Sequence, residues 1–153
     1  MTPTTDSVYN VYKENSMSKV LSMRVKDEVA ERLSRMSRRL GRTASETGAL
    51  LLDEALRASE FGQIEFRDSI VGRQAYMKGS SLAVWEVISL AREFDMDPER
   101  TAGYLCWPLF RAQAALNYFQ AYPEEITAAI EDNDSYDFEK LRRRLPQIEL
   151  FEV

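Results

Sequence analysis

The chain has 153 residues, no histidine and a single cysteine, Cys106, and this inventory excludes several familiar sites at once. One cysteine cannot form a disulfide within the chain, and without histidine there is no Ser-His-Asp triad and no Cys-His pair. Zinc sites built from several thiolates are excluded for the same reason. We therefore predict that the protein is not an enzyme and holds no metal or other cofactor.

Long apolar runs are also missing, because no stretch of the sequence is long and apolar enough to cross a bilayer. Residues 1–18 are polar and do not read as a signal peptide, which needs a basic start followed by an apolar segment. We expect these residues to form a flexible N-terminus. The expected location is the cytoplasm, with no membrane partner.

The net charge of −5 is distributed unevenly along the chain. Residues 19–60 contain nine lysine and arginine residues against seven acidic ones, whereas residues 61–153 contain ten against sixteen. The first segment suits a phosphate backbone and the second would be repelled by it. This division predicts two modules with different partners.

The first module begins with a segment that alternates in the manner of a half-buried strand, from Val20 to Val25. Its apolar face consists of Leu21, Met23 and Val25. Val29, Leu33, Met36 and Leu40 then recur at helical spacing before Gly41, which predicts a helix over residues 27–40. Thr43 to Glu46 form a capping-box sequence, and the helix after it should end near Ser59 and bury Leu51, Leu52, Ala55 and Leu56.

One strand and two helices in about forty residues have too small a core to be stable alone, so a partner chain is expected. The run from Lys19 to Val25, the turn at Gly41 and the capped second helix resemble the ribbon-helix-helix family of Arc, MetJ and CopG. The resemblance implies a homodimer in which two strands pair antiparallel and enter the major groove of double-stranded DNA.

The alternation of side chains along the predicted strand indicates which of them would contact DNA. The apolar face must pack against the helices, so the opposite face should contact bases, with Arg24 on guanine, Ser22 on a base edge and Val20 on a thymine methyl. The start of the second helix, with its free amides, is the candidate phosphate site. Its residues are Arg42, Thr43, Ala44 and Ser45.

The second module, residues 61–130, is predicted to start with a short hairpin around residues 64–77 and to continue as helices. One helix should contain Trp85 and Ile88, and three more should start at Pro98, Pro108 and Pro123. The helices on either side of Cys106 and Trp107 have the proportions of a helix-turn-helix. The expected fold is therefore mainly α, with a ribbon-helix-helix followed by a small helical domain and a C-terminal tail.

This module resembles the helix-turn-helix-like domain of unknown function found in antitoxins of the VapB type. The residues that carry the resemblance are Tyr76–Trp85, Asp97–Ala102, Ala114–Tyr118 and Tyr122–Ile126. In that family the domain accompanies a ribbon-helix-helix segment and is encoded beside a PIN-like ribonuclease toxin. The resemblance therefore implies a toxin-antitoxin pair.

The helix after Pro108 offers polar side chains that can read bases, but the acidic surroundings favour binding of a protein instead. These side chains are Arg111, Gln113, Asn117 and Gln120. Four aromatic residues of the module are expected in its core, namely Trp85, Trp107, Tyr118 and Phe119. Cys106 is expected to be a buried small hydrophobe.

Residues 131–153 are predicted to form a C-terminal tail that begins with a polar linker, residues 131–136. The rest of the tail is both apolar and basic, so we expect it to bind to a protein surface. It can dock on its own domain or on a toxin. For a toxin, Arg142, Arg143 or Arg144 would pair with the carboxylates that hold magnesium. The predicted toxin-binding residues are Phe138, Leu141, Arg142, Arg143, Arg144, Leu145, Ile148 and Leu150.

We expect an antitoxin that binds its operator as a dimer, represses its own operon and neutralises a PIN-like ribonuclease toxin. The alternative is a stand-alone ribbon-helix-helix regulator or DNA-organising protein whose C-terminal module mediates self-association. A metal enzyme using Asp132 and Asp134 is the third option, but acidic pairs in a linker are usually solvated.

Overall fold

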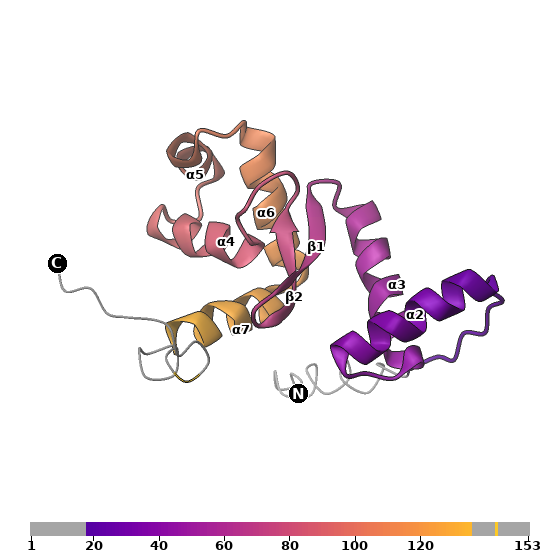
Figure 1. Cartoon of the computed structure of the whole chain (residues 1–153). Helices are drawn as coiled ribbons and strands as arrows, with labels where there is room; N and C mark the ends of the chain where they lie inside the picture. The colour runs from indigo at the N-terminus through magenta and orange to yellow at the C-terminus, as the bar shows by residue number, and fades with distance from the viewer. Residues whose placement is uncertain (1–17, 136–142, 144–153) are drawn as a thin grey trace, which may run out of the picture. The chain divides into compact units, whose positions relative to one another are not determined.

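The computed structural model describes residues 18–135 and residue 143. The described chain is mainly helical, with one small antiparallel sheet (Figure 1). It forms two compact units that divide between Thr47 and Gly48, inside the second of the two N-terminal helices.

The first helix, α2 (Asp27–Leu40), has the bounds predicted from the apolar spacing. Two acidic residues occupy its first turn and two arginines its last turn, which suits the helix dipole. Gly41 ends the helix in the left-handed conformation at φ 63°, and its N–H donates to the carbonyl of Arg38 at 3.2 Å. The predicted glycine cap is confirmed.

The next helix, α3 (Ala44–Glu60), starts at the predicted capping box. The Thr43 N–H donates to the Glu46 carboxylate at 2.9 Å, and the Glu46 N–H donates to the Thr43 hydroxyl at 3.1 Å. The predicted burial is absent from the single chain, in which Leu51 is only half-buried and Leu52, Ala55 and Leu56 are exposed. The side chains of α3 that are buried belong instead to Thr47 and Glu54.

Residues 18–26, which include the predicted strand, have no regular secondary structure in the single chain. A strand requires a partner for its backbone hydrogen bonds, and the sheet found in the described residues contains only β1 and β2 of the second module. Val20, Leu21, Met23 and Val25 are all exposed. The apolar face predicted to pack against the helices is therefore uncovered.

The predicted hairpin is confirmed as β1 (Ile64–Ser69) and β2 (Gly72–Met77). The strands pair antiparallel, from Ile64 opposite Met77 to Ser69 opposite Gly72. Gly72 has a φ of 114°, a conformation that favours glycine, and it follows the two residues of the turn. The hairpin therefore reverses the chain between the paired strands without a longer loop.

Four helices follow, in agreement with the predicted starts. They are α4 (Val84–Glu93), α5 (Pro98–Leu105), α6 (Leu109–Ala121) and α7 (Pro123–Asp134). Asp97 caps α5 by accepting from the Glu99 N–H at 2.9 Å. Helix α7 includes residues 131–134, so the polar segment predicted as a linker is in fact mostly helical.

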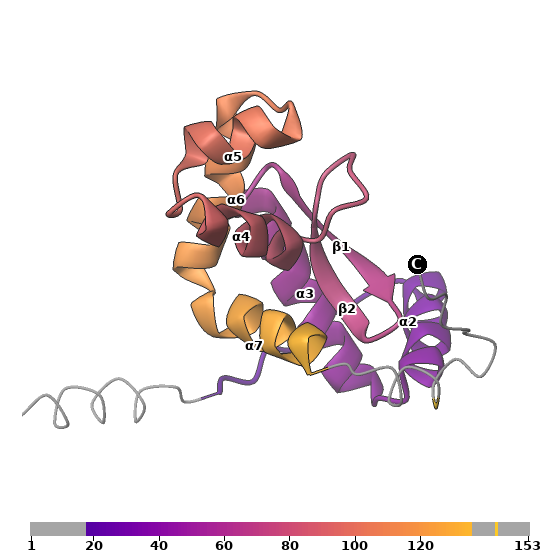
Figure 2. The same cartoon turned by 90° about the vertical axis from the view of Figure 1, so that its left-hand side faces the viewer.

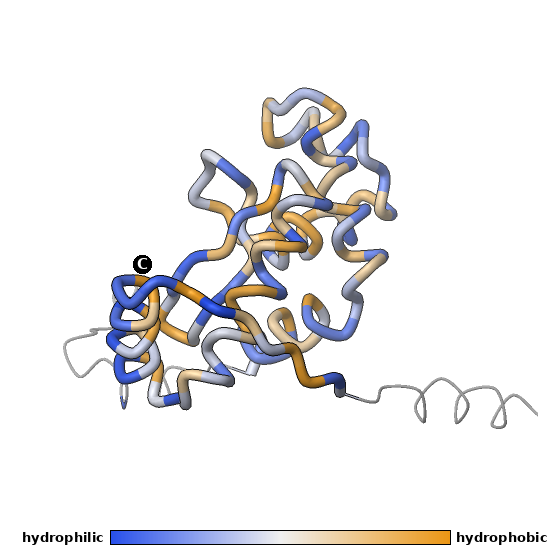
Figure 3. The backbone as a smooth tube through the Cα atoms, turned by 90° about the vertical axis from the view of Figure 1, so that its right-hand side faces the viewer, coloured by the Kyte–Doolittle hydropathy of each residue, from blue (hydrophilic) through white to orange (hydrophobic). Residues whose placement is uncertain are grey.

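The core of the second unit lies between the hairpin and α4, α6 and α7 (Figure 2). Hydrophilic and hydrophobic stretches are interspersed along the described chain, as the colours in Figure 3 show. Tyr118 is completely buried, and Trp85, Trp107 and Phe119 are partly buried against the core, as predicted. Cys106 is exposed, which corrects its predicted burial: it caps the C-terminus of α5 in a turn rather than lying on a helix face.

No helix in the described part of the chain is both long enough and apolar enough to span a bilayer.

Candidate functional site

The predicted base-contact residues lie on the extended segment before α2. Val20, Ser22 and Arg24 are exposed, and Val20 has 94% of its surface accessible. The residues between them are exposed as well, with 72% for Leu21 and 66% for Met23. In one chain, both faces of this segment are therefore open to solvent.

The predicted phosphate contacts gather at the start of α3. Arg42, Thr43, Ala44 and Ser45 are all exposed there. The Thr43 N–H is already used, because it donates to Glu46. The first-turn amides of Ala44 and Ser45 have no acceptor within an α-helix, so they remain the backbone donors for a phosphate.

Glu46 modifies this site electrostatically. The hydrogen bonds that it accepts from the backbone and hydroxyl of Thr43 lower the pKa of its carboxyl. The group is therefore ionised at neutral pH and places a negative charge in the first turn of the helix. This charge stabilises the helix but opposes a phosphate, so Arg42 has to supply the attraction.

Helix α2 and the turn after it carry a basic surface, of which only Arg42 is among the predicted phosphate contacts. Residues 32–42 contain five arginines and no acidic residue, and all five side chains are exposed. The high arginine content of residues 32–42 could have been recognised from the sequence alone. The arginines are Arg32, Arg35, Arg38, Arg39 and Arg42.

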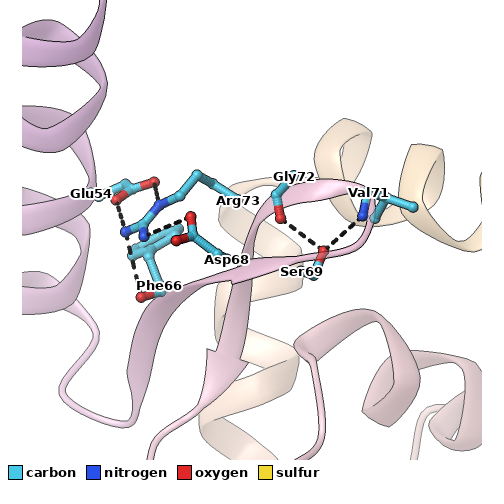
Figure 4. Close-up of polar contacts among 7 residues, drawn as sticks. All are labelled: Glu54, Phe66, Asp68, Ser69, Val71, Gly72 and Arg73. Carbon is cyan, nitrogen blue, oxygen red and sulfur yellow. Dashed lines mark hydrogen bonds and ion pairs between the residues drawn. The ribbon is translucent and has the colours of Figure 1, made fainter. Parts of the chain in front are cut away.

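Helix α3 is held to the hairpin by an ion pair that sequence patterns did not indicate. Arg73 donates from Nε to Glu54 Oε1 at 3.0 Å and from a terminal nitrogen to Oε2 at 2.6 Å (Figure 4). Its other terminal nitrogen lies 3.3 Å from Asp68. The hydrogen bonds with Glu54 raise the pKa of Arg73. The exposed fraction of the Glu54 side chain is 8%, so this is a largely desolvated pair.

A second contact of α3 is made by Arg57. Its guanidinium donates to the Tyr118 hydroxyl at 3.0 Å and to the Glu125 carboxylate, and it stacks 3.9 Å from the centre of the Tyr122 ring. Burial lowers the pKa of Arg57, but the hydrogen bonds with Glu125 and Tyr118 outweigh it and raise the pKa. Burial also raises the pKa of Tyr118, which stays neutral and donates to Glu125 at 2.8 Å.

These contacts leave the other side of α3 uncovered. Leu52 and Leu56 are each two residues from Glu54, which at roughly 100° per residue places them on the opposite side of the helix. Their exposed fractions are 39% and 53%. Helix α3 therefore has one side committed to its own unit and an opposite apolar side that is open.

The helix-turn-helix candidate of the second unit is poorly suited to reading bases. Arg111 donates to the carbonyl of Lys78 at 2.6 Å and lies 4.5 Å from the Trp107 ring, so its guanidinium is already engaged. Gln113 donates to Asn117 at 2.9 Å. Leu109 and Phe110, in the first turn of α6, are exposed.

Two further predictions concern acidic residues and the tail. The described residues include no group of three or more side chains able to hold a metal, and Asp132 and Asp134 lie on the last turn of α7. Arg143 is described and exposed. The other predicted toxin-binding residues lie outside the described residues, namely Phe138, Leu141, Arg142, Arg144, Leu145, Ile148 and Leu150.

Comparisons of the chain with protein-family models, with curated proteins and with solved structures found no significant match.

Proposed function

We propose that this protein is a dimeric DNA-binding regulator of the ribbon-helix-helix type. The observation that carries the proposal is the open apolar surface of its N-terminal part. Leu21, Met23 and Val25 extend from a segment without a pairing partner, and Leu52 and Leu56 form an open side of α3. A second copy supplies both a strand for the segment and an apolar surface for the helix.

The energetics favour such a dimer. Burying one large aliphatic side chain contributes about 1.5–3 kcal/mol, and the two copies together would bury at least six such side chains from the strand alone. Pairing also satisfies the backbone groups of residues 20–25, which have no regular hydrogen bonds in one chain. The open surface of the monomer thus becomes the core of the dimer.

The same arrangement presents a DNA-reading face. With Leu21, Met23 and Val25 turned inward, the alternation of a strand directs Val20, Ser22 and Arg24 outward. Arg24 is suited to the O6 and N7 atoms of guanine. The five arginines of residues 32–42 supply the positive potential that a phosphate backbone requires.

The resemblance to VapB-type antitoxins extends the proposal to the second half of the chain. In this view the acidic second unit and the tail bind a PIN-like ribonuclease toxin in the cytoplasm, and the dimer represses its own operon. The engaged Arg111 and the apolar start of α6 support a protein-binding role for this unit. A regulator without a toxin, whose second unit self-associates, remains the alternative.

A gel shift with DNA from upstream of its own gene tests DNA binding. The change Arg24→Ala should weaken specific binding about 5- to 150-fold for each copy in the dimer, because each copy loses one bidentate base contact worth about 1–3 kcal/mol. Arg32→Ala, an exposed arginine on α2, is the matched control for loss of charge. Equal effects of the two changes would contradict base reading by Arg24.

Co-expression with the adjacent gene tests the antitoxin role. The neighbour should be toxic when expressed alone and harmless together with this chain. A neighbour that is harmless alone would contradict the antitoxin role while leaving the DNA-binding proposal intact.

A further inference from the structure

Exposed apolar side chains lie on either side of the turn between α5 and α6. Tyr104, Leu109 and Phe110, which we name the α5–α6 knob, have exposed fractions of 66%, 47% and 61%. Residues 101–110 include no charged side chain, in a sequence where 29% of residues are charged. An exposed apolar patch of this kind marks an interaction surface.

The knob is held in place by its backbone. Cys106 adopts the left-handed conformation at φ 54°, and the Trp107 N–H donates to the Ala102 carbonyl at 2.9 Å. Thr101 and Ala102 are buried on the inner side of α5, and Arg111 covers the Trp107 ring. The exposed side chains therefore belong to the adjoining ends of two packed helices, α5 and α6, which a short turn connects (Figure 1).

The composition of the knob argues against DNA as its partner. A recognition helix contacts base edges with polar side chains near its N-terminus, where α6 has Leu109 and Phe110. The one cation of this turn of the helix, Arg111, is directed to the Lys78 carbonyl. The start of α6 therefore offers no free cation of its own to neutralise a phosphate.

The surroundings indicate the charge of the partner. Residues 61–135 contain six basic residues and twelve acidic ones. Tyr104 packs 5.5 Å from the Phe94 ring, next to the exposed Asp95, and Glu99 is exposed on α5. Arg100 lies 3.5 Å from Asp95, so these two charges offset each other, and the exposed Glu93 and Glu99 remain as the acidic margin. An apolar surface with an acidic margin fits an apolar cleft with a basic margin.

We propose that the α5–α6 knob inserts into an apolar cleft, bordered by lysine or arginine, on the toxin protein that this chain neutralises. The proposal rests on the antitoxin role proposed above. It assigns to the second unit a contact with the toxin that is separate from the predicted contact of the tail. Aromatic side chains in such positions dominate binding energies, so Tyr104 and Phe110 should be the main anchors.

The test is a calorimetric titration of the full chain with the purified product of the adjacent gene. The double change Tyr104→Ser and Phe110→Ser should weaken binding at least 10-fold, because each anchor loses its buried ring. The matched control is Ile70→Ser with Val71→Ser, which removes two exposed apolar residues at the hairpin turn. The control should bind like the wild type. A third variant, Glu99→Lys, should weaken binding several-fold at low salt because it opposes a basic margin.

The contrary outcomes would each overturn the proposal, and they differ in what they leave standing. Unchanged binding by the double variant would remove the knob and leave the antitoxin role standing. Absence of binding by the wild type would remove both. Gel shifts on the same samples should show unchanged DNA binding, and a loss in the double variant would assign the knob to DNA. A wild-type assembly larger than a dimer that the double variant abolishes would assign the knob to a second copy instead.

Discussion

Thr43 and Glu46 show how two side chains fix the start of a helix. Each accepts a hydrogen bond from the backbone of the other, at 3.1 Å and 2.9 Å. Because the first amides of a helix lack partners within it, this exchange satisfies two groups that would otherwise depend on water. The exchange therefore stabilises the start of α3 at Ala44.

Loss of the Thr43 hydroxyl should destabilise this helix start. We expect Thr43→Ala to lower the free energy of unfolding by about 1 kcal/mol, as other cap deletions do. Thermal or denaturant unfolding of the full chain measures this change. The control is Ser45→Ala, two residues further along the chain. Ser45 takes no part in the two hydrogen bonds between Thr43 and Glu46, so its loss should have a smaller effect.

The charge of Glu46 should make part of the stability depend on pH. Its pKa is lowered in the folded chain, so the unfolded state binds a proton more readily and folding is favoured above the ordinary glutamate pKa. The stability difference between the wild type and Glu46→Gln should therefore be largest at neutral pH. It should shrink as the pH falls through the lowered pKa of the folded state. A difference independent of pH would show that the charge contributes nothing.

Among the secondary-structure elements, α3 has two roles because its two sides differ. Glu54 and Arg57 tie one side to the hairpin and to the ends of α6 and α7, while Leu52 and Leu56 occupy an open apolar side. The division between the compact units falls inside this helix. In the proposed dimer, α3 therefore connects the DNA-binding half to the protein-binding half.

Removal of Arg73 should be costly because it leaves the Glu54 carboxylate buried without a partner. We expect Arg73→Met to destabilise the chain by about 3 kcal/mol, measured by denaturant unfolding. Combining it with Glu54→Leu should restore most of the loss, since the uncompensated charge is then removed. If the double variant were no more stable than the single one, the account of the buried pair would be wrong.

The local features of the elements were predictable from sequence, and their burial was predictable only in part. Periodicity and capping residues identified α2, the start of α3, the hairpin and the helix starts at Pro98 and Pro123, because these signals act over a few residues. The ion pair between Glu54 and Arg73 and the hydrogen bond from Arg111 to the Lys78 carbonyl join residues far apart in sequence. No local sequence pattern predicts such contacts. The exposure of Cys106 was missed because a left-handed cap was not anticipated at a cysteine.

The candidate site could be predicted only in part for a related reason. The strand of residues 20–25 and the burial of Leu52 and Leu56 are properties expected of two chains, and a single chain does not form them. In the proposed dimer, the alternation in the sequence reflects the pairing of this segment with a second copy. At the scale of the whole molecule, the proposed dimer would account for both features.

DNA binding by the complete dimer should depend strongly on salt. Each arginine that contacts a phosphate releases counterions, so Arg42→Ala should weaken binding to all sequences alike and reduce the salt slope by about one per copy. Arg24→Ala should act mainly on the specific operator. Titrations at several salt concentrations, with operator and unrelated duplexes, separate the two effects.

The mass of the full chain in solution tests the central claim most directly. Sedimentation equilibrium at micromolar concentration should give twice the mass of one chain, and Met23→Lys, which places a charge on the inner face of the strand, should shift the protein toward monomers. A wild-type protein that stays monomeric at these concentrations, with the segment around Met23 still unpaired, would contradict the dimer and the DNA-binding function built on it.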